Sequence, residues 1–206
     1  MKLFTGMGPN PRAVRIFMAE KGIELPLEQV DLIAGDNRKD AHLARNPAGQ
    51  LPTLELDDGS FLAEITVICD YLEEKNPSPP LIGTTAEERA ETRMWTRRID
   101  LTIIEPLTNG FRYAEGLGLF KDRVHVIPAA ADDLKAIAQE QLAKLDGLIA
   151  GKKFICGDRF SYADVHLYAF LEFAQGVGQP LDGKLENLQA WFTRVAARPS
   201  IEASKA

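Results

Sequence analysis

Two places along this chain hold groups that can recognise an extended, charged peptide. Leu51-Pro52 enters a predicted strand, and an X-Pro bond in such a place favours a cis isomer that turns the Leu51 N–H and C=O sideways. Those groups can then pair with a peptide as a neighbouring strand would. Glu64 lies twelve residues after Pro52, in the first turn of a predicted helix. Its carboxylate can accept from an ammonium, and the helix N-terminus suits a carboxylate.

Both places also have simpler interpretations. Pro52 can merely begin an edge strand, and Glu64 can merely complement the helix dipole.

Disulfide bonds and metal binding find less support in the sequence. Cys69 and Cys156 are far apart, and the three histidines (His42, His125 and His166) form no HExxH or His-x-His pattern. We therefore expect no disulfide scaffold, no zinc site and no metal.

The composition is that of a globular protein. The 206 residues are 45% hydrophobic and 26% charged, and the net charge of −6 argues against a nucleic-acid partner. No apolar run reaches the ~18–20 residues that span a membrane. The chain opens on Met-Lys-Leu-Phe without a signal-peptide pattern. We expect a cytoplasmic protein with no membrane segment.

The first part of the chain alternates strand and helix patterns. Asn10-Pro11 is a helix start, with Asn as N-cap and Pro at the first helical position, and Gly22 ends that helix. Asp57-Asp58-Gly59 is a hairpin turn. The predicted order is βαβαββα, with strands at 2–5, 25–32, 51–56 and 60–62 and helices at 10–22, 37–45 and 64–76.

The second part is predicted to be all-helical. The Pro-rich run 76–80 places a linker at 78–85, between a domain of residues 1–77 and another of residues 86–206. Ser161 to Asp164 forms a capping box, a stabilising feature at the start of one helix. The expected helices are 86–114 with a kink at Pro106, 128–150, 161–175 and 184–197.

Two motifs resemble the cytosolic glutathione S-transferase family over nearly the whole chain. The first runs from Asn46 to Pro52 and is followed by Glu64, and the second is the box Ser161–Asp164. The resemblance, which extends to the nu- and theta-like bacterial members, implies a thioredoxin-like N-terminal domain, an all-helical C-terminal domain and a homodimer. It also implies glutathione, an acidic tripeptide with a central thiol, as co-substrate.

The resemblance further implies a glutathione-binding set. Gln50 would reach the glycyl end, and Glu64 with Ile65 would hold the γ-glutamyl end, although family members usually carry serine where Ile65 stands. Arg38 and Lys39 are the nearest cations by sequence for the ligand carboxylates, unless they form a solvated helix face. The predicted set is Gly8, Asn10, Arg38, Gln50, Leu51, Pro52, Glu64 and Ile65.

The position that activates the thiol departs from the family pattern. Members use Tyr, Ser or Cys there, whereas Phe4 and Gly8 stand at those positions and no cysteine precedes Cys69. Thr5 keeps a hydroxyl, which can equally face the core. The remaining candidate is Asn10, in a Gly-Pro-Asn-Pro turn that resembles the Thr-Pro-Asn turn of nu-like members.

An asparagine amide can supply the stabilisation that this step requires. Lowering a thiol pKa from ~8.5 to about 6.5 takes ~2.7 kcal/mol. A hydrogen bond to a charged group supplies ~1.5–3 kcal/mol, and a helix N-terminus adds ~0.3–1 kcal/mol. Capping would use the Asn10 oxygen and a thiolate its NH₂, so the two roles are compatible. We predict Asn10, with Thr5 as the alternative, as catalytic residues.

A second-substrate pocket is expected between the domains. Met7 and the residues Phe111, Arg112 and Tyr113 are candidates to line it, unless the last three belong to the helical core. By the resemblance, Asp100 would reach the glutathione amine across a dimer.

Three functions remain open. The first is transfer of glutathione to a hydrophobic electrophile, as in detoxification. The second is glutathione-dependent reduction of disulfide bonds or peroxides, toward which the nu-like resemblance inclines. The third is a non-catalytic binding protein, which the loss of Tyr, Ser and Cys at the activating positions supports.

Overall fold

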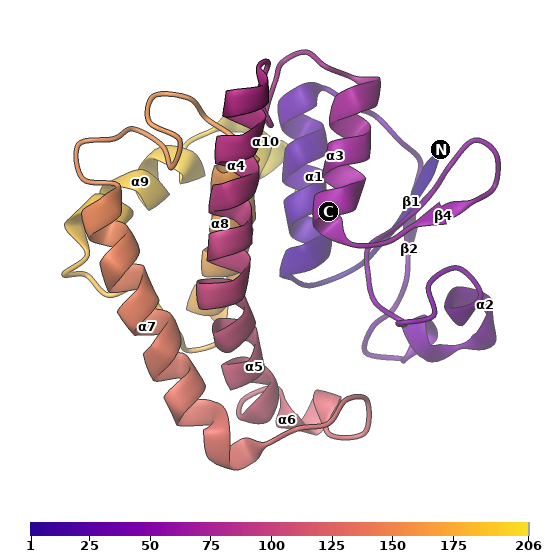
Figure 1. Ribbon diagram of the computed structural model, residues 1–206. Helices are drawn as coiled ribbons and strands as arrows, with labels where there is room; N and C mark the ends of the chain where they lie inside the picture. The colour runs from indigo at the N-terminus through magenta and orange to yellow at the C-terminus, as the bar shows by residue number, and fades with distance from the viewer. Residues whose placement is uncertain (206) are drawn as a thin grey trace. The chain divides into compact units, whose positions relative to one another are not determined.

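A four-stranded mixed sheet with the strand order β2-β1-β3-β4 organises the N-terminal part of the chain (Figure 1). The computed structural model describes residues 1–205. β1 runs parallel to β2 and antiparallel to β3. The predicted thioredoxin-like arrangement is confirmed, although β2 begins two residues later than expected, because Pro26 before it has no N–H for the ladder, and ends at Gln29. The strands are β1 (Lys2–Thr5), β2 (Leu27–Gln29), β3 (Thr53–Glu55) and β4 (Phe61–Leu62).

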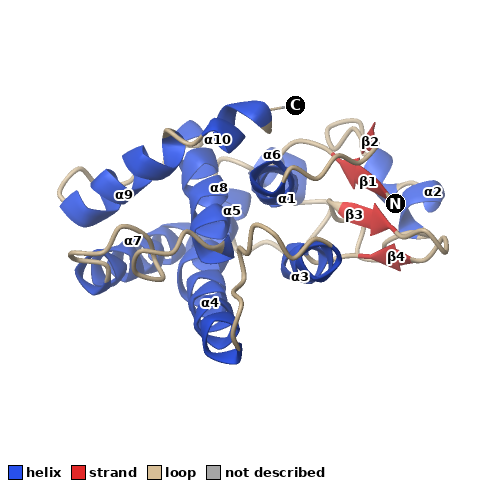
Figure 2. Cartoon of the chain, turned by 90° about the horizontal axis from the view of Figure 1, so that it is seen from above, coloured by secondary structure: helices blue, strands red, loops and turns tan. Residues whose placement is uncertain are grey.

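Three helices complete the predicted order. α1 (Pro9–Lys21) and α3 (Ile65–Lys75) cover one face of the sheet, and α2 (Asp40–Leu43) lies on the other (Figure 2). The single helix expected at 37–45 is instead the 3₁₀ turn η1 (Asp36–Arg38) followed by α2, because Lys39 between them is extended, with ψ 151°. The core between sheet and helices includes the fully buried Leu3, Val14, Phe17, Leu54 and Ile68.

Two helix starts differ from the sequence prediction. α1 begins at Pro9 with Gly8 as its N-cap, so Asn10 is the second helical residue and not the cap. Gly8 has φ 104°, a conformation that residues with a side chain rarely adopt, which explains why the cap falls there. Similarly, α3 begins at Ile65, and Glu64 is its N-cap instead of a first-turn residue.

The chain forms two units, which divide between residues 81 and 82, and residues 198–205 belong to the first. The short helix α10 (Pro199–Ala203), which the sequence pattern did not predict, packs along α1. Arg12 of α1 donates to the carbonyl of Ile201 over 2.8 Å. Arg198 donates to Glu20 over 2.6 Å. The first unit thus includes both ends of the described chain.

The second unit, residues 82–197, is helical as predicted. α8 is its central helix and is buried along most of its length, including His166. α4 and α5 are separated by the π-helical turn η2 (Asp100–Ile104), next to Pro106, whose missing N–H removes one α-helical bond. The helices are α4 (Ala86–Ile99), α5 (Glu105–Tyr113), α6 (Leu117–Phe120), α7 (Ala131–Leu148), α8 (Tyr162–Gly176) and α9 (Glu186–Ala196), with the 3₁₀ turn η3 (Pro128–Ala130) before α7.

The predicted capping box at the start of α8 is present. Asp164 accepts from the backbone N–H of Ser161 over 2.9 Å and from that of Ile155 over 2.9 Å, and Trp191 donates to it over 2.8 Å. Burial raises the pKa of Asp164, while these donors oppose the rise. The box therefore joins α8, the preceding loop and α9. Within residues 1–205, no helix is both long and apolar enough to cross a membrane.

Candidate functional site

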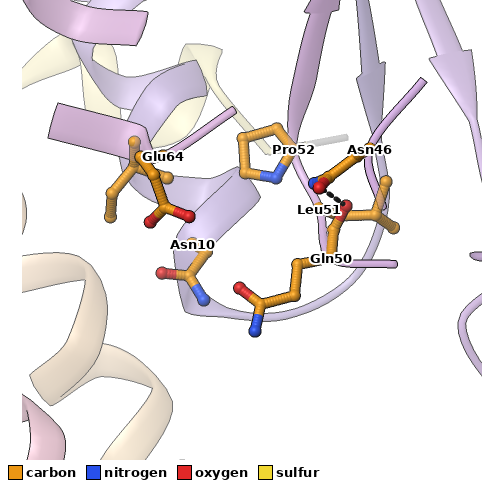
Figure 3. Close-up of a pocket in the computed structure, with 7 residues that line it drawn as sticks. Asn10, Asn46, Gln50, Leu51, Pro52 and Glu64 are labelled. Carbon is orange, nitrogen blue, oxygen red and sulfur yellow. Dashed lines mark hydrogen bonds between the residues drawn. The ribbon is translucent and has the colours of Figure 1, made fainter. Parts of the chain in front are cut away.

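A pocket opens in the first unit where three segments meet (Figure 3). The segments are the start of α1, the loop before β3 and the start of α3. The side-chain ends of Asn10, Gln50 and Glu64 turn toward the same space. The lining residues are Asn10, Asn46, Gln50, Leu51, Pro52, Glu64 and Ile65. Six of these seven are residues of the predicted binding set, and Asn46 is the addition.

A buried asparagine holds the loop that forms the floor of the pocket. Asn46, 4% exposed, donates to the carbonyl of Gln50 over 3.1 Å and accepts from the N–H of Ala48 over 3.1 Å. The Nε2 of His42 in α2 lies 3.0 Å from the same Gln50 carbonyl. The backbone of Gln50 is therefore fixed from two sides, while its exposed side chain extends into the pocket.

Leu51 offers the pocket its main chain. The Leu51 side chain is 7% exposed and packs in a core cluster with Phe4 and Val30. Its bond to Pro52 is cis, as expected from the sequence. Phe4 is 1% exposed and belongs to the same cluster. Phe4 therefore presents no group to the pocket.

The start of α3 pairs a free carboxylate with a helix N-terminus. Glu64 is exposed and has φ 67°, the one positive φ among the described residues other than glycine. The first N–H groups of a helix have no partner within it, and the first turn of α3 holds no acidic residue. A carboxylate beside such N–H groups suits an amino-acid end that carries both an ammonium and a carboxylate.

The start of α1 offers two donors from one residue. Pro9 and Pro11 have no N–H, so Asn10 supplies the backbone N–H of the first three helical positions. The side chain of Asn10 makes no capping hydrogen bond, because Gly8 is the cap. Its amide extends into the pocket, where the NH₂ can donate to an anion (Figure 3).

Three other predicted residues lie away from the pocket lining. Thr5 is fully buried, and its hydroxyl accepts from Nη1 of Arg15 over 2.8 Å, which places it in the core. Gly8 contributes its backbone at the cap of α1. Arg38 donates to the carbonyl of Ala48 over 3.3 Å and is exposed. The residues that line the pocket include no lysine or arginine.

The predicted second-substrate residues of α5 pack within the helical unit. Phe111 meets the rings of Phe120 and Phe173 edge to face, with centroids 6.0 and 5.0 Å away. Arg112 lies over the Phe120 ring, 5.6 Å from its centroid, and desolvation lowers its pKa. Phe111 and Arg112 therefore belong to an aromatic cluster of this unit, and Tyr113 beside them is half-buried.

Two further candidates occupy different units. Met7, on the turn between β1 and α1, is 57% exposed. Asp100, on the π-helical turn of the second unit, lies 3.3 Å from Nε2 of the fully buried His166. The Nδ1 of His166 lies 3.3 Å from the hydroxyl of Tyr162. Asp100 is thus held by a buried network.

Asn46 belongs to the sequence motif Asn46–Pro52 but not to the binding set predicted from the sequence. A usable signal was present, because Asn before Pro favours an Asx turn, in which the side chain bonds the backbone two residues on. The hydrogen bond from the Ala48 N–H to the Asn46 oxygen is that turn.

Comparisons with protein families cover most of the chain. A model described as "Glutathione S-transferase, N-terminal domain" matches residues 7–75. A second, "Glutathione S-transferase, C-terminal domain", matches residues 120–199. All seven residues that line the pocket lie within the first match.

Individual relatives agree with these matches. Glutathione S-transferase 2 of Saccharomyces cerevisiae is 32% identical over 96% of this chain and 86% of its own. Glutathione S-transferase GstA of Escherichia coli O157:H7 is 31% identical over 98% of this chain and 96% of its own. The crystal structure of Gtt2 from Saccharomyces cerevisiae superposes with a TM-score of 0.92 at 30% identity, covering 100% of both chains.

Proposed function

Because this chain belongs to the glutathione S-transferase family, we propose that its pocket binds glutathione and stabilises the thiolate for transfer to an electrophilic small molecule. The observation that carries the proposal is the convergence of Asn10, Gln50 and Glu64 around the main chain of Leu51. These groups offer an amide donor, a second amide, a carboxylate and a strand-like backbone. Glutathione presents a matching set of a thiol, a glycyl carboxylate, an ammonium and peptide groups.

The proposed pose follows from the charges. The ammonium of the γ-glutamyl end pairs with Glu64, and its carboxylate accepts from the N–H groups at the start of α3. Ile65 has no hydroxyl to add to that site, so the backbone N–H groups serve alone or with Thr66. The cysteinyl unit lies along Leu51, and Gln50 donates to the glycyl carboxylate. Arg38, near the edge of the same loop, is the cation proposed for that carboxylate.

The thiol would lie beside Asn10. Its proton is lost to solvent, and the resulting thiolate accepts hydrogen bonds from the Asn10 side-chain NH₂. A bond of this kind is worth ~1.5–3 kcal/mol, which corresponds to one to two pKa units of the thiol. Thr5 is not proposed for this role, because its hydroxyl is buried and hydrogen-bonded to Arg15.

The proposed reaction is a nucleophilic displacement. The thiolate sulfur attacks an electrophilic carbon, a sulfur–carbon bond forms, and the leaving group departs with the electron pair of the broken bond. We place the electrophile near Met7, whose side chain is exposed on the turn between β1 and α1. The family resemblance also supports a homodimer, which light scattering can test.

A calorimetric titration with glutathione and with its oxidised dimer tests the binding step. We expect saturable binding of reduced glutathione at one site per chain, and turnover of a haloarene as electrophile. Tight binding of the dimer together with turnover of a small mixed disulfide would instead favour disulfide reduction. Binding without turnover of either substrate would favour a non-catalytic role, and no binding would overturn the proposal.

The variant Asn10→Ala tests the activating group. The thiolate absorbance of bound glutathione, followed against pH, should shift to a thiol pKa higher by about one to two units. Asn187→Ala, on α9 of the helical unit, is the matched control and should leave the titration unchanged. An unchanged titration for Asn10→Ala would rule Asn10 out as the activator.

A further inference from the structure

Arg15 connects the turn that leads into the pocket with the C-terminal segment of the chain. The turn comprises residues 6–8, between β1 and α1. Nη1 of Arg15 donates to the hydroxyl of Thr5 over 2.8 Å and to the carbonyl of Gly6 over 3.1 Å. Nε of the same guanidinium donates to the carbonyl of Ser204 over 3.2 Å. One side chain of α1 thus links the end of β1 to the segment that contains Ser204.

The C-terminal segment is itself held along α1. Arg12, one turn before Arg15 and 7% exposed, donates to the hydroxyl of Ser204 over 2.6 Å and to the carbonyl of Ile201 over 2.8 Å. Arg198 donates to the two carboxylate oxygens of Glu20 over 2.6 and 2.7 Å. The carbonyl that Arg15 uses is therefore presented by a segment with several independent attachments.

Two of the three residues in this turn are glycines, which have no side chain that could fix its conformation. Gly6 lies so close to the end of β2 that a Cβ would approach the carbonyl oxygen of Val30 to 2.8 Å. Gly8 has φ 104° and open space around it. Two glycines in three residues leave the turn free to take many conformations when it is unrestrained. The hydrogen bonds from Arg15 to Thr5 and Gly6 restrain it where it leaves the sheet.

We propose that Arg15 is a positioning residue for the thiol end of the pocket. It fixes the direction in which the chain leaves β1 and enters α1, and so places the Asn10 amide and the start of α1 beside Leu51. Ser204, in the segment that follows α9, supports Arg15 from the opposite side through its carbonyl. This role rests on the proposed function of the pocket. Arg15 is not among the residues that line the pocket and acts through Asn10.

The test compares Arg15→Gln, Arg15→Lys and Thr5→Val. With saturating glutathione, the thiol pKa read from thiolate absorbance should rise by about one unit in Arg15→Gln, because a displaced Asn10 loses its hydrogen bond to the sulfur. Arg15→Lys should give a smaller rise in the thiol pKa. A lysine ammonium can keep a hydrogen bond to one side, whereas the planar guanidinium donates both to Thr5 and to Ser204. Thr5→Val, which removes one acceptor and keeps the volume, should shift the thiol pKa in the same direction.

The matched control is Arg194→Gln. It removes a guanidinium that donates to a backbone carbonyl of the helical unit, that of Lys153 over 2.7 Å, so the thiol pKa should not change. Circular dichroism establishes that each variant is folded at the temperature of the titration. If Arg15→Gln does not fold, Arg15→Lys and Thr5→Val decide by the same criterion.

The outcomes separate this inference from the function on which it rests. A wild-type protein that binds no glutathione, or binds it without lowering the thiol pKa, contradicts the proposed function. A wild-type protein that lowers the thiol pKa, with folded Arg15 and Thr5 variants that lower it equally, contradicts the positioning role of Arg15 alone.

Discussion

The side-chain amide of Asn46 donates to the carbonyl of Gln50 across a single turn, over 3.1 Å. The same nitrogen lies 3.4 Å from the hydroxyl of Thr53, and the side-chain oxygen accepts from Ala48. Asn46 is buried and uses both its donor and its acceptor. The loop that presents Gln50 and Leu51 is therefore held from inside by one residue.

Asn46→Asp should disrupt this loop while changing the side-chain volume very little. A carboxylate would place an oxygen against the Gln50 carbonyl, which then loses one of its side-chain partners and faces a buried like charge, at a cost of about 2 kcal/mol. We expect a lower free energy of unfolding in urea and about tenfold weaker glutathione binding by calorimetry, since 1.4 kcal/mol corresponds to tenfold.

Asn109→Asp is the matched control for that change. Asn109 accepts from Nη1 of Arg112 over 3.0 Å, so a carboxylate there keeps the acceptor. We expect no loss of stability in this variant. Equal stability of Asn46→Asp and the wild type would show that the amide donor of Asn46 does not hold the loop.

Much of the fold follows from local patterns in the sequence. The βαβαββα order was predictable because Gly22, Pro47 and Asp57-Asp58-Gly59 end or turn each element by their own backbone preferences. The helical second unit was predictable for a similar reason. The Ser161–Asp164 box is a local spacing rule, and the structure confirms it.

What could not be predicted depends on contacts between distant parts of the chain. The N-cap of α1 is Gly8 instead of Asn10, and Gly6, two residues before it, lies against Val30 and Leu51, so the path by which the chain leaves β1 depends on residues far along the sequence. α10 has five residues and no strong periodicity of its own, and it is stabilised by Arg12 of α1. The burial of Thr5 similarly depends on Arg15 and the sheet around it.

Asp164→Asn should destabilise the helical unit. The carboxylate accepts from the Ser161 and Ile155 N–H groups and from Trp191, and an amide would turn a donor toward one of them. We expect a loss of about 2–4 kcal/mol in the free energy of unfolding, measured by denaturant titration. Asp158→Asn, with a side chain 85% exposed, is the control and should change stability by less than about 0.5 kcal/mol.

The pH dependence of this loss has a defined sign. Burial raises the pKa of Asp164 in the folded state, so its contribution is fully present below the ordinary pKa of an aspartate and decreases as pH rises through the folded value. The cost of Asp164→Asn should therefore be greater in mildly acidic buffer than at neutral pH. A cost that grows with pH would show that the donors outweigh burial.

The two cysteines should be unreactive in the native protein. Cys69 is fully buried and Cys156 is 7% exposed, and neither forms a disulfide. Burial raises the pKa of the Cys156 thiol, which lowers its thiolate fraction at neutral pH. With an aromatic disulfide reagent we expect slow reaction of the native protein and two rapid equivalents in denaturant.

The reactivity of Cys156 should increase with pH, because its thiolate forms later than that of an ordinary cysteine. Cys156→Ser identifies its contribution, since only Cys69 then remains to react. Rapid native reaction of one equivalent would contradict this prediction. Such a reactive cysteine could itself take part in thiol–disulfide exchange. If both cysteines are unreactive, glutathione is the thiol that would have to do so.

Glu64 should show opposite effects of one substitution on stability and on binding. Its φ of 67° is costly for a residue with a side chain, so Glu64→Gly should raise the free energy of unfolding by about 1 kcal/mol. The same variant loses the carboxylate proposed for the ligand ammonium and should bind glutathione at least about tenfold more weakly. Glu64→Gln should lose the affinity without the gain in stability, because its backbone remains in the same conformation.

Two controls accompany these variants. Glu74→Gln, at an exposed residue of α3, controls for the loss of one negative charge. Cysteinylglycine lacks the γ-glutamyl ammonium, so it should bind the wild type, the two Glu64 variants and Glu74→Gln equally. Glutathione binding by Glu64→Gly as tight as that of the wild type would remove Glu64 from the proposed site, because the variant would have lost every side-chain atom that can contact the ligand.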